Sequence, residues 1–284
     1  MNNNTRGILI TALGVFIMSL ESLFIKLTSI SPFTFSFYLG IFMFISMLLL
    51  LVIKQRDIIR EITKTSFYIF LLCGILMGSA NIFFIWAIKS TTAANVVLII
   101  GTGALFTSFF SYLFYKEKIR INVLIASFFM ILGLLIIFND KIGVGSLKGN
   151  VLALLCTMTF SLSFVLMSKY SRINRIALTG MTGISLAIIA YFVSDTITID
   201  LYNLSVVAVM GLIITPYSRV LIFNGTKFIN ASEVSLLMII ETVMGPIWVW
   251  MVLKEMPSSY TFIGGTLILA TLIVNSLYIL NKGK

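Results

Sequence analysis

The chain lacks histidine altogether, and it holds only two cysteines and four prolines in 284 residues. Without histidine there is no HExxH zinc helix and no Cys/His dyad, and the commonest acid–base side chain near neutral pH is missing. The sequence also has no G-x-x-x-x-G-K-[ST] phosphate-binding loop, which argues against an ATP-driven pump. These absences predict no metal, no cofactor and no enzyme activity.

The two cysteines, Cys73 and Cys156, both lie within apolar stretches. Their expected depths in those stretches differ, so the sequence predicts two buried, unpaired thiols rather than a disulfide.

Charge is scarce as well: charged residues make up 11% of the chain and hydrophobic residues 59%, and the mean hydropathy is +1.09. A soluble domain carries about a quarter charged residues. The net charge of +10 comes mainly from short loops between apolar stretches and forms no continuous basic face. The composition therefore predicts a protein of the lipid bilayer that does not bind nucleic acid.

Apolar stretches of about 20 residues, the length that crosses a bilayer as a helix, recur along the whole chain. They do not alternate in polarity as the strands of a membrane β-barrel would. The first one continues past Glu21 without a small-residue cleavage site, so we expect a helix and not a signal peptide. The ten predicted spans are Ile8–Leu27, Pro32–Ile53, Ser66–Ile88, Ala93–Tyr115, Ile121–Phe138, Leu152–Ser168, Ile176–Val193, Leu204–Phe223, Val234–Leu253 and Phe262–Leu280.

The basic residues of the loops predict how these spans are oriented. Fourteen Lys and Arg residues fall on one expected side of the membrane and five on the other. Because cytoplasmic loops carry the excess of positive charge, both termini are predicted to be cytoplasmic. The expected location is the inner, cytoplasmic membrane of the cell, with several passes.

The two halves of the chain are related in sequence. A shift of 138 residues places Ala87-Ile88-Lys89 on Gly225-Thr226-Lys227 and Lys116-Glu117 on Lys254-Glu255, without a gap. Each half has five spans, an odd number, so the halves are expected to enter the membrane in opposite orientations. The prediction is an all-α protein of two inverted five-helix repeats, residues 1–142 and 143–284, with a substrate site between them.

Two segments carry a resemblance: the run from Ala87 to Ala93, and the run from Glu241 to Pro246 with the later Leu253-Lys254-Glu255. The first is similar to the segment that opens the fourth helix, and the second resembles the ninth helix and the turn that follows, in the EamA-type transporters of the drug/metabolite transporter superfamily. An arginine that members often carry early in the second helix is absent from Phe35–Phe42. The resemblance implies ten spans in two repeats and export of small organic metabolites, amino acids or drugs without ATP.

Glu241 is the first candidate for substrate binding or coupling, because an acid within a span usually faces protein or water and serves function. Its helical stripe contains Gly245 and Trp248, and an acid, a glycine and an indole on one face can hold an amine-bearing ligand. Pro246 predicts a local kink there. The alternative is an acid that only pairs with a neighbouring helix.

Arg219 and Glu21 complete the set of charged candidates within spans. Arg219 has three open interpretations: a partner of Glu241, a group that binds a substrate carboxylate or phosphate, or a side chain that extends to the cytoplasmic surface. Glu21 is predicted to accept a proton or a cation, with pairing to Lys26 as the alternative.

Uncharged candidates are Asn81, Asn95, Trp248 and Tyr217. The asparagines are either ligand contacts or hydrogen bonds between helices, and the aromatic rings line a cavity or lie at the membrane interface. Together the sequence predicts a secondary transporter that works by alternating access and is coupled to protons through Glu241 or Glu21. Its partners are a small-molecule substrate and lipid; a passive channel or a membrane scaffold is the alternative, and the oligomeric state stays open.

Overall fold

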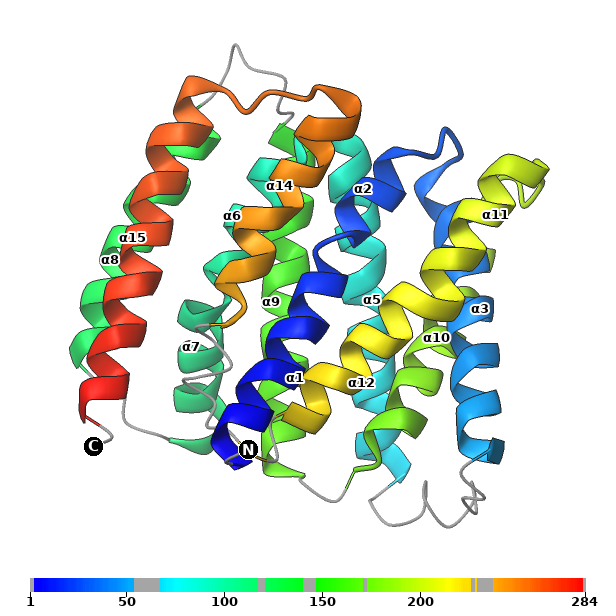
Figure 1. Ribbon diagram of the computed structural model, residues 1–284, viewed down its shortest axis with the longest axis horizontal. Helices are drawn as coiled ribbons and strands as arrows, with labels where there is room; N and C mark the ends of the chain where they lie inside the picture. The colour runs from blue at the N-terminus through cyan, green and yellow to red at the C-terminus, as the bar shows by residue number, and fades with distance from the viewer. Residues whose placement is uncertain are drawn as a thin grey trace.

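A computed structural model describes residues 3–53, 67–116, 121–139, 147–170, 173–225, 228 and 237–282. Every regular element within these ranges is a helix (Figure 1). The helices are α1 (Asn3–Met18), α2 (Glu21–Lys26), α3 (Pro32–Ile53), α5 (Phe67–Ser90), α6 (Ala93–Gly101), α7 (Gly103–Tyr115), α8 (Ile121–Phe138), α9 (Leu147–Lys169), α10 (Arg175–Val193), α11 (Leu201–Val209), the π-helix η1 (Met210–Ile214), α12 (Thr215–Gly225), α14 (Ile239–Leu253) and α15 (Ser259–Lys282).

The lengths of these helices fit a protein that crosses a membrane several times. Eight helical stretches are long and apolar enough to span a bilayer, and Ile239–Leu253 and Ser259–Asn275 are apolar but shorter. Three of the eight are interrupted: α1 with α2, α6 with α7, and α11 with η1 and α12. The ninth span was expected to start at Val234, which lies outside the described residues.

The two halves run in opposite directions through the bundle. Thr91, just after α5, accepts a hydrogen bond from Lys26 at the end of α2 and donates one to Asn150 in the first turns of α9. The first helical stretch of the first half thus ends where the first helix of the second half begins. Helix α1 begins and α15 ends together at the opposite end of the bundle (Figure 1).

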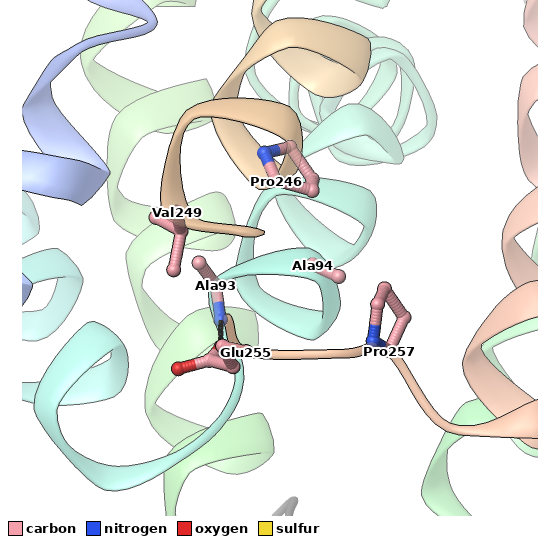
Figure 2. Close-up of a pocket in the computed structure, with 6 residues that line it drawn as sticks. All are labelled: Ala93, Ala94, Pro246, Val249, Glu255 and Pro257. Atoms are coloured by element: carbon pink, nitrogen blue, oxygen red, sulfur yellow. Dashed lines mark hydrogen bonds between the residues drawn. The ribbon is translucent and has the colours of Figure 1, made fainter. Parts of the chain in front are cut away.

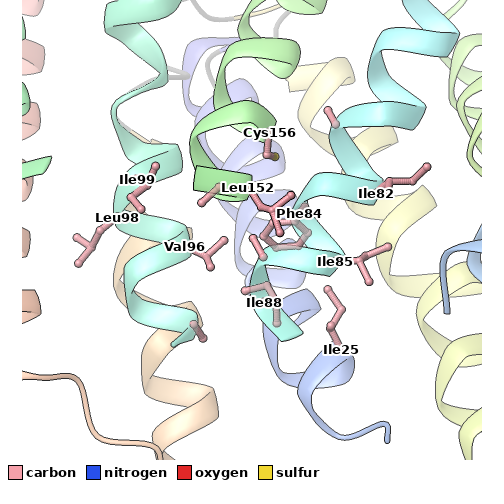
Figure 3. Close-up of a cluster of buried hydrophobic side chains, with 14 of the residues drawn as sticks. Ile25, Ile82, Phe84, Ile85, Ile88, Val96, Leu98, Ile99, Leu152 and Cys156 are labelled. Carbon is pink, nitrogen blue, oxygen red and sulfur yellow. The ribbon is translucent and has the colours of Figure 1, made fainter. Parts of the chain in front are cut away.

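The main core cluster joins helices of the first half, α2, α3, α5, α6 and α8, to α9, α10, α11, η1, α14 and α15 of the second half. Figure 3 shows Ile85 and Ile88 of α5, Val96 of α6 and Leu152 of α9 side by side. Cys156 lies in the same cluster, and both cysteines are buried and free, as the sequence predicts. Buried apolar side chains of this kind give the closely packed helix contacts that lipid alone does not drive.

Candidate functional site

Arg219 is the buried cation around which the candidate site is built. It lies in α12 and its side chain is only 8% exposed. Its Nη2 donates a hydrogen bond of 2.9 Å to Oδ1 of Asn81 in α5. The Asn81 amide is fixed in turn, because its Nδ2 donates to the carbonyl of Met77 at 2.7 Å. Asn81 and Arg219 therefore link the first half of the chain to the second.

Glu21 is the buried acid beside this cation. It begins α2, directly after the interruption at Ser19 and Leu20, and is 3% exposed. It interacts electrostatically with Arg219, and Thr215 of α12 lies beside its carboxyl group. Nε of Arg219 has no hydrogen-bond partner within the described residues; Oε1 of Glu21 and Oγ1 of Thr215 have none within 3.5 Å, although the Thr215 hydroxyl interacts with the Glu21 carboxyl group. A buried donor without a partner, beside a carboxyl group and a hydroxyl, forms a site that a polar ligand would satisfy.

Glu241, in the first turn of α14, adds a second acid to this set. Glu241 interacts electrostatically with Glu21 and Arg219, and Cys156 of α9 interacts electrostatically with all three groups. Unlike Glu21, Glu241 is partly exposed. The expected ion pair between Arg219 and Glu241 is not formed: in the described part of the chain the ion pair within 4.0 Å joins Lys26 to Glu255. Arg219 instead has a neutral amide as its direct partner.

Trp248 connects α14 to the interruption between α1 and α2. Its Nε1 donates a hydrogen bond of 2.9 Å to Oγ of Ser19, and its ring meets Phe16 edge-on with a centroid distance of 5.7 Å. Ser19 immediately precedes Leu20 and Glu21, so Trp248 fixes the backbone that presents the acid. This is a contact between the halves rather than a contact with Glu241.

Asn95 and Tyr217 lie elsewhere. The Asn95 side chain donates to Asn150 at 3.3 Å and accepts from Thr261 at 2.5 Å, so its amide is already used in bonds between helices. Tyr217 is 43% exposed, and the structure does not bring it into the buried set. A cavity of about 460 Å³ between α8 and α15, bounded by Asn122 and Asn275 among mostly apolar side chains, contains none of the predicted site residues.

A second polar cluster, which the sequence reasoning did not find, closes the end of the bundle opposite the start of α1. Lys26 contacts Oε2 of Glu255 at 2.7 Å and the carbonyl of Thr91 at 2.8 Å. Oε1 of Glu255 accepts from the backbone N–H of Ala93 at 2.8 Å, at the start of α6 (Figure 2). Only the repeated Lys-Glu dipeptide pointed to Glu255. Its partner Lys26 is too far away in sequence to be inferred.

Charged side chains buried between two related bundles of apolar helices define a multi-pass membrane protein of the transporter class. The model of the EamA-like transporter family matches residues 5–139 and again residues 147–277. The chain belongs to this family.

Individual relatives agree with this assignment. An uncharacterized transporter of Clostridium kluyveri is 26% identical over 218 residues, which are 72% of this chain and 70% of that protein. The uncharacterized transporter YdfC of Bacillus subtilis is 24% identical over 184 residues, 62% of this chain and 60% of its own. One crystal structure superposes with a TM-score of 0.71 at 14% identity, over 99% of both chains, which shows a shared fold.

Proposed function

We propose that this protein is a secondary transporter that exports small organic solutes across the cytoplasmic membrane by alternating access. The observation that carries the proposal is the buried set of Glu21 and Arg219, with Glu241 in electrostatic range, where α2, α12 and α14 of the two halves meet. Burying such charges in a membrane costs about 2.5–3.5 kcal/mol each on insertion scales, so charged residues within spans usually serve a function. Glu21 and Arg219 are almost fully covered, so a solute reaches them only if the halves move.

The groups left unpaired suggest the chemistry of the solute. Oε1 of Glu21 is a free acceptor for an ammonium group, and Nε of Arg219 is a free donor for a carboxylate. Amino acids and small amines that carry one or both of these groups are therefore the first candidates. Asn81 and Trp248 belong to the same region through their bonds to Arg219 and Ser19. Asn95 and Tyr217 stay outside this proposed contact set.

Proton coupling is the second part of the proposal. Two acids face one guanidinium in this set, so a proton or a cationic group on Glu21 or Glu241 balances the charge in a medium of low dielectric constant. A proton that leaves when the solute binds would couple export to the proton gradient. Both acids are positioned to exchange a proton for a solute, because each interacts electrostatically with Arg219.

Flux measured in proteoliposomes tests the transport proposal. The purified protein is reconstituted with an imposed pH gradient, and the uptake of individual labelled amino acids and small amines is followed. Saturable uptake that unlabelled solute competes for and that the pH gradient accelerates is expected. Flux that stays linear with concentration would indicate a pore, and no flux above empty liposomes for the whole panel would refute the proposed substrate class.

Substitution of the acids tests the coupling proposal. Glu21→Gln and Glu241→Gln keep the shape of each side chain but cannot release a proton, so at least one is expected to abolish acceleration by the pH gradient. Asp195→Asn, an exposed acid in the link after α10, serves as the matched control and is expected to leave coupling unchanged. If both glutamine variants keep full proton-dependent uptake, the coupling proposal is wrong.

The membrane topology belongs to the same proposal. Ten crossings with both termini in the cytoplasm, and repeats divided at residues 142 and 143, follow from the loop charges and the repeated sequence. The family model matches on both sides of this boundary, and the start of α1 and the end of α15 lie at the same end. A reporter that is active only in the cytoplasm is fused to each terminus in turn, and both fusions are expected to be active.

A further inference from the structure

Asn81 and Arg219 are joined by a hydrogen bond across 138 residues of sequence. The same shift of 138 aligns the two halves without a gap, so that Ala87-Ile88-Lys89 matches Gly225-Thr226-Lys227. Under this alignment α5 of the first half corresponds to α12 of the second, and Asn81 falls on Arg219. The two bonded side chains thus occupy the same position of the repeat, one in each half.

Contact between equivalent positions locates the axis that relates the halves. A position and its image under a two-fold rotation lie equally far from the axis on opposite sides, so images that touch must lie at the axis. A second close contact joins the corresponding helices α3 and α10, where the offset between the halves is 143 residues rather than 138. Gly40 and Gly183 are each the ninth residue of their helix, α3 and α10, and a Cβ built on either would lie 2.5–2.6 Å from the carbonyl oxygen of the other.

The bonds of Asn81 show what it does for Arg219. The amide nitrogen is held by the carbonyl of Met77, so the amide oxygen faces the guanidinium and accepts from Nη2. Both side chains are buried, at 5% and 8% exposure. Nε of Arg219 stays without a partner in the described part of the chain. Asn81 therefore anchors one end of the guanidinium and leaves Nε for another group.

We propose that Asn81 is a positioning residue that keeps the Arg219 guanidinium on the pseudo-two-fold axis while the halves rock. Exchange between the two states of an inverted repeat interchanges the conformations of its halves. This exchange swaps two equivalent positions with each other. A contact between them therefore joins the same two positions before and after, and it is retained in both states. A contact at one end of the bundle, such as that between Lys26 and Glu255, does not join equivalent positions and is not retained in both states. The role in transport rests on the proposed function; the pairing itself does not.

An exchange of the two residues tests this inference. Asn81→Arg alone places two guanidinium groups at the axis, and Arg219→Asn alone leaves two amides. The double variant Asn81→Arg/Arg219→Asn rebuilds the pair with its polarity reversed, and the symmetry predicts that it fits. The matched control exchanges the next buried pair under the same shift, Ile82→Val with Val220→Ile, and is expected to behave as the unmodified protein.

Two readouts are used on the full chain. The first is uptake of a labelled amino-acid mixture into proteoliposomes, where each single variant is expected to lose about tenfold or more, as removal of a charge-assisted hydrogen bond would cause. The second needs no substrate: the rate at which N-ethylmaleimide labels Cys156, which is 5% exposed and close to Arg219, in a Cys73→Ser background. The single variants are expected to raise this rate.

Recovery in the double variant decides the outcome. The inference predicts that the exchange restores both uptake and slow labelling of Cys156. A double variant that labels as fast as the worse single variant overturns the pairing at the axis. If the double variant restores slow labelling of Cys156 but not uptake, the positioning role is wrong, and the Asn81–Arg219 pair is only a structural contact. If the unmodified protein does not transport the mixture, the proposed substrate class fails, and the labelling rates alone decide whether the pair lies on the axis.

Discussion

Single side chains at the candidate site act mainly by fixing other side chains. Trp248 holds Ser19, which precedes the turn into Glu21, and Asn81 holds Arg219. The groups with unsatisfied atoms, Glu21 and Arg219, are thus each supported by a neutral residue from the opposite half. Such a division leaves the charged groups available to a ligand while their orientation is set by the fold.

Trp248→Phe tests this support at the residue scale. Phenylalanine keeps an aromatic contact with Phe16 but cannot donate to Ser19, so the loss is that of one hydrogen bond, about 0.5–1.5 kcal/mol of unfolding free energy. The expected result is a lower midpoint of thermal unfolding. Ser19→Ala also removes the bond that the Ser19 hydroxyl donates to the carbonyl of Phe16, so it is expected to cost more than Trp248→Phe, and the double variant should lose less than the sum of the two single variants. Fully additive losses would contradict a shared bond.

At the scale of elements, the interruptions of the helices are the features that matter for the site. Glu21 follows the interruption between α1 and α2, and Arg219 lies in α12, which follows the π-helix η1. Pro216 explains part of this, because it has no N–H for the carbonyl of Leu212 four residues before it. The hydroxyl of Ser46, in α3, donates to that carbonyl at 2.7 Å. A side chain of a neighbouring helix thus donates to a carbonyl that cannot accept a bond from the proline.

Ser46→Ala is expected to destabilise the protein for this reason. It leaves the carbonyl of Leu212 without its donor in an apolar environment, which costs about 1–3 kcal/mol. The matched control is Ser108→Ala: Ser108 donates to the carbonyl of Ala104 within its own helix, where no proline intervenes. Thermal unfolding in detergent measures both. Equal, small losses in the two variants would contradict the role given to Ser46.

At the scale of the whole molecule, the two halves are held together at one end by charge. Lys26 and Glu255 form an ion pair that joins α2 to the link between α14 and α15, and Glu255 also accepts from the start of α6. Their side chains are 18% and 17% exposed, so solvent screens the pair only partly. In the proposed alternating-access cycle, this contact has to open before a solute can pass at this end.

Glu255→Gln is expected to favour opening at that end. Glutamine still accepts from Ala93 but carries no charge for Lys26, and a pair of this kind contributes about 0.2–1 kcal/mol, up to about a fivefold change in population. A single cysteine at Val249, which is 1% exposed beneath this contact, reports opening through a membrane-impermeant maleimide. Lys254→Gln, a neighbouring exposed residue, is the control. Unchanged labelling would show that the ion pair does not hold this end closed.

The sequence by itself determined the membrane class, the repeated halves, the approximate helices and the three charges to consider. These properties depend on local composition: a long apolar stretch becomes a helix in lipid whatever it packs against, and a charge within it is costly wherever it points. The shift of 138 that aligns the halves also makes Asn81 and Arg219 equivalent positions, but this equivalence alone does not predict that they touch.

Only the tertiary structure decided which groups meet. Arg219 bonds Asn81 rather than Glu241, Lys26 pairs with Glu255 rather than Glu21, and Asn95 is used in contacts with Asn150 and Thr261. Each of these partners is distant in sequence. Their contact depends on how helices rotate and cross when side chains interlock, and the pattern of apolar residues along one helix does not specify that geometry.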